Sequence, residues 1–383
     1  MNLKVIQENA FDKICKVAVF IGLPLSVHVG NGQSFRRSQK LWMVFITVIK
    51  CFAFGISVNF IFVIVSSSTV RLTFYGCIFV GCGINGFVIA KRKKISMSLD
   101  NIHMLSRILS PNKPIGNKFV KYQIIFHFIA LAFFCVFMTV FFFYQEWQRS
   151  SAALRLPCMI LSAYHDVCAS LVFCCIIFSF CVSANISGTV LILCDSIFTV
   201  LSAIIEAYGK RLKKSFRSGN FSKESLIADI KMFNIIAKQV ELVDEALSAC
   251  IFLLYGMFII MFYISVSIGL SKEDSFKTNM VTAYMVWNLV FAVFLFSRLT
   301  LSGSRVGKES IKLKNICMDC SKRIVSFSTD ESVLRTFSLL LGGIKDTNLK
   351  VTGGGMFAVE KSLFLTVTGT MVTYGVVLFQ MKE

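Results

Sequence analysis

The stretch "TVTGTMVTYGVVLFQMKE" at residues 366–383 is apolar enough to cross a membrane and carries no charge before Lys382. Threonines and a glutamine nevertheless recur along it at helical intervals. Positions four, three, four and three residues apart share one face of a helix. This face, which we call the polar stripe, is formed by Thr366, Thr370, Thr373, Val377 and Gln380, and Met381 borders it.

Two explanations fit a polar stripe on a membrane helix. Thr and Gln side chains often hydrogen-bond two membrane helices together. A pore lined by identical copies of one helix needs small polar groups and one apolar constriction, which Val377 or Met381 would supply. The stripe is nearly continuous and ends in Gln380 at the outer surface, where water is available. This favours the pore, and packing between helices is the alternative.

The composition is that of an integral membrane protein. Of the 383 residues, 55% are hydrophobic and only 16% are charged, and the mean hydropathy is +0.71. Soluble domains carry about 25% charged residues. The net charge of +19 would otherwise suggest nucleic acid as a partner. Because Lys and Arg collect in loops on one side of a bilayer, we expect membrane lipid as the partner and no nucleic acid.

Seven apolar stretches are long enough to span a bilayer, which takes about 20 residues. They lie at 41–65, 72–90, 122–144, 157–184, 246–270, 279–298 and 362–381. A shorter stretch at 14–29 is interrupted by Lys16, Pro24 and His28. We expect it to be a cytoplasmic or interfacial helix, and a signal sequence is the alternative.

The loop charges predict the orientation. Segments 1–40, 91–121, 185–245 and 298–355 hold 32 of the 40 Lys and Arg residues, whereas the opposite loops and the C-terminal tip hold six. This excess places the N-terminus in the cytoplasm and the C-terminus outside. A G-protein-coupled receptor has the reverse orientation, and the chain lacks the Asp-Arg-Tyr and Asn-Pro-x-x-Tyr motifs of that class.

The long inner segments are helical in pattern. Apolar residues recur at three- and four-residue steps from Leu226 to Leu247, and similar patterns follow the fourth and sixth spans. We therefore expect an all-α membrane protein in which spans four to six extend into a cytoplasmic helical bundle, with breaks at "LGGIKD" (341–346) and "TGGG" (352–355). The expected parts are a cytoplasmic N-terminal segment (1–40), spans one to six with their extensions (41–297), a cytoplasmic anchor segment (298–361), and the last helix with a short extracellular tip (362–383).

No pattern in the sequence indicates an enzyme. The four histidines are dispersed, and the glycine runs lack the context of a phosphate-binding loop. The fourteen cysteines are scattered without paired CxxC spacing, so neither a disulfide framework nor a metal site is predicted. We expect no catalytic residue and no cofactor.

The ending "TYGVVLFQM", which begins at Thr373, resembles the C-terminal signature of arthropod gustatory receptors, a family in the same superfamily as insect odorant receptors and their co-receptor. Thr373, Tyr374 and Gln380 match the signature, and Met381 replaces its usual Phe. The resemblance implies a tetrameric, ligand-gated, non-selective cation channel whose pore is lined by the last helix of each subunit. It also implies that Val377 and Met381 form a hydrophobic gate with Gln380 between them, and that Tyr374 packs against a neighbouring helix.

The resemblance further implies a ligand pocket in the outer half of spans one to six. The ligand would be a tastant, either a sugar or a bitter compound. The receptor would lie in the plasma membrane of chemosensory neurons as a homo- or heterotetramer with related subunits. The polar and aromatic candidates at that depth are Tyr144, Trp147, Tyr164, His165, Asp166, Tyr263, Tyr284, Trp287 and Asn288.

Alternatives remain for the pocket and for the function. Asp166 could instead form a hydrogen bond with His165 or Tyr284 that only holds helices together. A secondary transporter is a further candidate function, but the odd number of spans and the absence of an internal repeat disfavour it.

Overall fold

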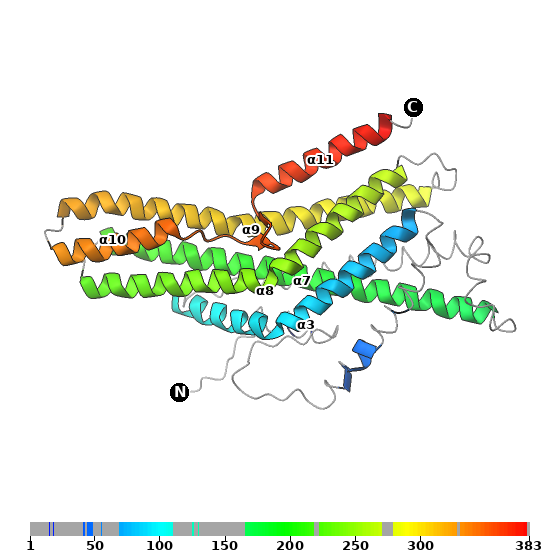
Figure 1. Ribbon diagram of the computed structural model, residues 1–383, viewed down its shortest axis with the longest axis horizontal. Coiled ribbons are helices and arrows are strands. Elements are labelled where there is room, and N and C mark those ends of the chain that lie inside the picture. The colour runs from blue at the N-terminus through cyan, green and yellow to red at the C-terminus, as the bar shows by residue number, and fades with distance from the viewer. Residues whose placement is uncertain are drawn as a thin grey trace.

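The computed structural model describes residues 69–109, 165–217, 222–269, 279–327 and 330–380, together with a few positions between 15 and 55 and at 125 and 129. These residues form long helices and one small hairpin (Figure 1). The elements are α3 (Thr69–Leu109), α7 (His165–Arg217), α8 (Lys223–Gly269), α9 (Asn279–Phe327), α10 (Glu331–Asp346), β1 (Thr352–Gly353), β2 (Phe357–Ala358) and α11 (Lys361–Gln380).

Three helices are much longer than a bilayer requires. Helices α7, α8 and α9 contain 53, 47 and 49 residues, whereas a span needs about 20. Each helix joins an expected span to a neighbouring segment rich in Lys and Arg without a break. The prediction that spans four to six continue as helices is therefore confirmed.

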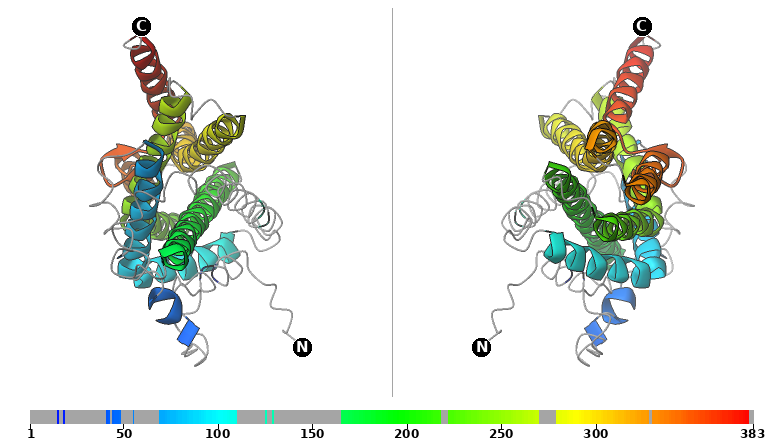
Figure 2. Two further views of the ribbon diagram at one scale, coloured as in Figure 1. Left: turned by 90° about the vertical axis from the view of Figure 1, so that its right-hand side faces the viewer. Right: turned by 90° about the vertical axis from the view of Figure 1, so that its left-hand side faces the viewer.

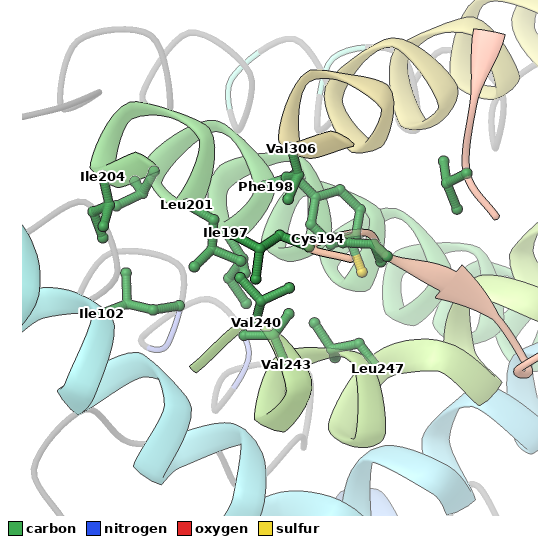
Figure 3. Close-up of a cluster of buried hydrophobic side chains, with 14 of the residues drawn as sticks. Ile102, Cys194, Ile197, Phe198, Leu201, Ile204, Val240, Val243, Leu247 and Val306 are labelled. Atoms are coloured by element: carbon green, nitrogen blue, oxygen red, sulfur yellow. The ribbon is translucent and has the colours of Figure 1, made fainter. Parts of the chain in front are cut away.

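The continuations pack into one bundle with α7 at its centre. Most side chains of α7 from Ile186 to Ile205 are buried, because α3, α8 and α9 all pack against it. Figure 3 shows this core, in which Phe198 and its neighbours on α7 lie among Ile102 of α3, Val243 of α8 and Val306 of α9. The views along the long axis of the molecule show the same grouping of helices (Figure 2).

Helix α3 is longer than the sequence indicates. We expected a span at 72–90 followed by a loop, but the helix continues through the basic run at 91–94 to Leu109. Polar contacts with α8 hold this continuation. Lys94 forms an ion pair with Glu245, and the Gln239 amide donates hydrogen bonds to the backbone oxygen and the hydroxyl of Ser98, at 3.0 and 2.8 Å.

Helix α10 continues through the break expected at 341–346, so that prediction is wrong. It begins where the Asp330 carboxylate accepts a hydrogen bond from the Ser332 N–H at 2.9 Å, a standard helix start. Gly342 and Gly343 lie inside the helix, because its apolar face, formed by Val333, Phe337, Leu340 and Ile344, is buried against α8 and α9. Packing of this face outweighs the helix-breaking tendency of two glycines.

The second expected break is confirmed, and it forms the hairpin. Gly354 and Gly355 have φ angles of 61° and 72°, which residues other than glycine rarely adopt. They turn the chain so that β1 and β2 pair antiparallel. Within the described ranges the fold is therefore helical apart from these two short strands, which the all-α prediction did not include.

Several of the expected spans lie in the described part of the chain. Among the described residues, three helical segments are long and apolar enough to cross a membrane: Asn185–Arg217, Lys223–Tyr263 and Met285–Lys322. The expected spans at 41–65 and 122–144, the first part of the 157–184 span and the segment at 14–29 lie largely outside the described residues.

Candidate functional site

Helix α11 leaves the middle of the molecule and leans away from the other helices (Figure 1). Its contact face is formed by Phe364, Val367, Met371 and Gly375, which are all partly buried and lie three or four residues apart. Phe364 packs on Phe296 of α9 with ring centroids 5.5 Å apart. At Gly375, a β-carbon would lie 3.6 Å from Cγ1 of Val266, so the helix passes close to α8.

The polar stripe lies on nearly the opposite side of α11 from this contact face, about 145° around the helix at 3.6 residues per turn. Thr366, Thr370, Thr373, Val377 and Gln380 are all exposed in the single chain. The three threonine hydroxyls donate to the backbone oxygens of Ser362, Thr366 and Gly369, four residues earlier, at 3.1, 2.9 and 3.0 Å. The hydroxyls therefore need no second helix, and the stripe does not join α11 to the described helices of its own chain.

Tyr374 lies at the edge of the contact face of α11. Its hydroxyl hydrogen-bonds the hydroxyl of Tyr263 on α8 at 3.2 Å, and the two ring centroids are 5.2 Å apart. The expectation that Tyr374 packs against a neighbouring helix agrees with this contact. Tyr263, a predicted pocket residue, thus contacts the C-terminal helix.

Asn288 of α9, a second predicted pocket residue, forms hydrogen bonds with α8. It is almost fully buried, and its amide donates to Ser265 Oγ at 3.1 Å and to the Met261 backbone oxygen at 3.4 Å. Residues 261 and 265 lie on one face of α8, and Tyr263 lies on the opposite face. The structure therefore places Tyr263 and Asn288 on different sides of α8 and describes no contact between them.

The other predicted site residues are described only partly. Trp287 is half-buried and stacks on Phe291 with ring centroids 6.3 Å apart. His165 and Asp166 begin α7, and Tyr284 lies in α9, but the side chains of all three are outside the described part of the chain. Tyr144, Trp147, Tyr164 and Met381 also lie outside the described residues.

The structure reveals a buried ion pair that the sequence reasoning missed. Arg298 of α9 donates to the Asp195 carboxylate of α7 at 2.6 Å, and the Asp195 side chain is only 4% exposed. Arg298 begins one basic segment and Asp195 lies in an apolar run, so no spacing rule connects them. The pair joins α7 to α9 where the bundle meets the expected end of the sixth span.

Metal-ligating side chains do not cluster in the described part of the chain. No group of three or more His, Cys, Asp or Glu residues there is arranged to hold a metal ion. Cys194, Cys250 and Cys317 are buried free thiols.

Comparison with known proteins identifies the family. The sequence profile of the 7tm chemosensory receptor family matches residues 14–383, nearly the whole chain. The chain belongs to the 7tm chemosensory receptor family. It is therefore a multi-pass membrane receptor rather than an enzyme, and the resemblance seen at the C-terminus is confirmed at the level of this family.

Solved structures show the same fold for the receptor. The insect olfactory receptor OR5 from Machilis hrabei matches with a TM-score of 0.67 at 15% identity, over 97% of both chains. The same protein in complex with eugenol matches with a TM-score of 0.66 at 14% identity, over 97% of this chain and 98% of that one. No curated protein sequence matches the receptor significantly.

Proposed function

We propose that the receptor is a gustatory, ligand-gated, non-selective cation channel in which four copies of α11 surround the pore. One observation carries this proposal. The polar stripe is exposed, its hydroxyls are satisfied within the helix, and α11 packs on its own chain through a different face. Such a face suits water and cations between identical subunits.

In this proposal the gate lies near the end of α11. Val377 and Met381 narrow the pore, Gln380 faces it between them, and the threonines line the deeper part. An apolar constriction holds back ions when it is dry and conducts when it widens or becomes wet. The tetramer is formed with identical or related receptor subunits.

The proposed orientation follows the distribution of charge. Residues 1–40 and the bundle, including the anchor segment 298–361, lie in the cytoplasm, and the tip after α11 lies outside. The receptor is placed in the plasma membrane of chemosensory neurons. The ligand is a sugar or a bitter compound, bound in the outer half of the spans by residues drawn from the predicted pocket set.

The sharpest test uses two neighbouring valines of α11. Val376 and Val377 are both exposed, at 50% and 43%, but only Val377 lies on the polar stripe. Whole-cell currents would be recorded from cells that express the receptor with Val377→Ser or with the matched control Val376→Ser. We expect ligand-free cation current to increase several-fold with Val377→Ser, because a polar group wets the constriction, and to stay unchanged with Val376→Ser.

Gln380→Ala supplies a second, separate readout. It should change the relative permeability of the cations while surface expression stays largely intact. If Val377→Ser and Gln380→Ala change only expression, α11 is a packing helix and the pore assignment is wrong. Tags on each terminus of intact cells test the orientation, and an exposed N-terminal tag would contradict it.

A further inference from the structure

The hairpin before α11 is small but closely held. We call residues 351–359 the hairpin joint. The Val359 N–H donates to the Val351 backbone oxygen at 2.9 Å, and both of these side chains are buried. A chain segment of this length that only linked α10 to α11 would not need buried ends or paired strands.

One face of α8 fastens the hairpin joint. The Asp244 carboxylate accepts the Thr352 N–H at 2.6 Å and also bonds the Thr352 hydroxyl, at 2.9 and 3.0 Å. One turn further along α8, the Ser248 backbone oxygen accepts the Gly354 N–H at 2.8 Å. A hydrogen bond to a carboxylate is about twice as strong as one between neutral groups.

Aromatic rings continue this contact along α8. The Phe357 ring packs edge-on against Tyr255, with centroids 5.3 Å apart, and lies 6.5 Å from the ring of Phe252. Tyr255 in turn bonds the Thr300 hydroxyl of α9 at 2.8 Å and packs edge-on against Phe296. The joint therefore sits where α8 and α9 are themselves locked together.

The end of the joint is pressed against α9. A β-carbon at Gly303 would lie 2.5 Å from Cγ1 of Val359 and 3.0 Å from its Cβ, far inside normal contact distance. Only glycine at this position lets Val359 approach α9 so closely. Gly307, one turn further along the same helix, has no atom within 4 Å of the corresponding position.

We propose that the hairpin joint sets the direction in which α11 leaves the bundle, and that the Gly303–Val359 contact fixes that direction. Val359 lies two residues before α11 begins at Lys361. Most of α11 is exposed, and ring contacts of Phe364 near its base and Tyr374 near its end join it to α9 and α8. The consequence for current rests on the proposed function, because there the position of α11 decides the width of the pore.

The geometric part is tested by distances between spin labels on unnatural amino acids, in the full-length receptor. One label replaces the exposed Leu339 of α10, and the other replaces Leu365 near the base of α11 or Val376 near its end. Gly303→Ala must displace Val359 by about 1 Å, because carbon atoms pack at about 3.5–4.0 Å. The displaced base tilts α11. Because the helix rises 1.5 Å per residue, the displacement grows along it to on the order of 2–3 Å at residue 376 and is smaller at residue 365.

Matched variants keep the test decisive. Gly307→Ala should leave both distances unchanged, and Val359→Ala in the Gly303→Ala background should reverse most of the shift. Asp244→Ala introduces no steric clash and should broaden the distance distribution. Glu245→Ala removes the neighbouring carboxylate, which pairs with Lys94, and should leave the distribution unchanged. Unchanged distributions in folded Gly303→Ala and Asp244→Ala receptors would overturn the proposal, as would equal shifts in Gly303→Ala and Gly307→Ala.

Currents separate this proposal from the proposed function. In a channel, Gly303→Ala should change the ratio of ligand-free to ligand-evoked current at least several-fold, and Gly307→Ala should not. Shifted distances in a receptor whose current responds to neither Val377→Ser nor Gly303→Ala would refute the pore role of α11 and leave the joint standing. Normal currents with unchanged distances in both joint variants would refute the joint and leave the channel standing.

Discussion

Helices α7 and α11 are both rich in apolar residues, yet their surroundings are opposite. In the apolar stretch of α7 that begins at Asn185, 89% of the most hydrophobic 18-residue segment is buried inside the protein. On α11, Leu365 and Val372 are 72% and 58% exposed, and the whole polar stripe is uncovered. One helix is enclosed by three neighbours of its own chain, and the other touches its chain along a single face.

The difference shows that hydropathy alone does not say what covers an apolar helix. Protein covers α7, so its side chains must fit their neighbours closely. The exposed surface of α11 is left for lipid or for further subunits, and large exposed apolar surfaces mark such contacts. Substitutions in α7 should therefore change stability, whereas substitutions in α11 should change function.

The largest expected effect is a loss of stability when the core around α7 is disrupted. Phe198→Ala removes a fully buried ring and should cost about 3–5 kcal/mol of stability, because the surrounding helices cannot collapse into the cavity. Leu365→Ala, at an exposed position on α11, is the control and should leave stability nearly unchanged. Thermal unfolding of the detergent-solubilised receptor measures both. Equal losses would mean that α11 is as enclosed as α7.

The second effect concerns the ion pair that joins α7 to α9. Arg298→Ala removes the charged partner of the buried Asp195 carboxylate and should cost about 1.5–3 kcal/mol. Glu206→Ala breaks the exposed pair with Lys210 and should have little effect, because solvent screens surface pairs. The same unfolding measurement applies. If both variants behave alike, the buried pair does not stabilise the α7–α9 contact.

The third effect tests the attachment of α11 to α8. Tyr374→Phe keeps the ring but removes the hydrogen bond to Tyr263, a loss of about 0.5–1.5 kcal/mol. Because this bond holds α11 against its own chain, its loss should ease movement of the helix and lower the ligand concentration for half-maximal current about 2- to 10-fold. Tyr263→Phe should give the same shift, and the double variant should add little further. Additive shifts would show that the two hydroxyls act separately.

The smallest effect is a pH dependence within the bundle. Burial raises the pKa of Asp229 above its ordinary value, although Arg211, 3.6 Å away, opposes the shift. The folded state then binds this proton more tightly than the unfolded state, so Asp229 lowers stability as pH rises through the window above its ordinary pKa of about 4. Asp229→Asn should raise the midpoint of thermal unfolding by about 1–2 °C at neutral pH.

The gain from Asp229→Asn should shrink as the pH falls toward the ordinary aspartate range, because the native carboxyl is then protonated as well. Asp346→Asn removes the same charge from an exposed position and serves as the control. A gain that grows on acidification would contradict the assigned direction of the pKa shift.

Much of the local structure could be predicted from the sequence. The apolar periodicity from Leu226 to Leu247 identified the continuation of span five, and the glycines at 353–355 identified a turn. Gly342 and Gly343 wrongly predicted a break, because burial of the apolar face of α10 outweighs the low helix propensity of glycine. The length of α3 was also missed, since its basic run is typical of a loop at a membrane surface.

The sequence by itself determined the membrane class, the long helices, the polar stripe and the family to which its C-terminal signature points. Each of these depends on spacing within one segment or on composition, which the order of residues already contains. Only the tertiary structure decided that α7 is enclosed, that Arg298 meets Asp195, and that Gly303 receives Val359. These contacts join residues far apart in the chain, and they exist because several packed helices bring them together.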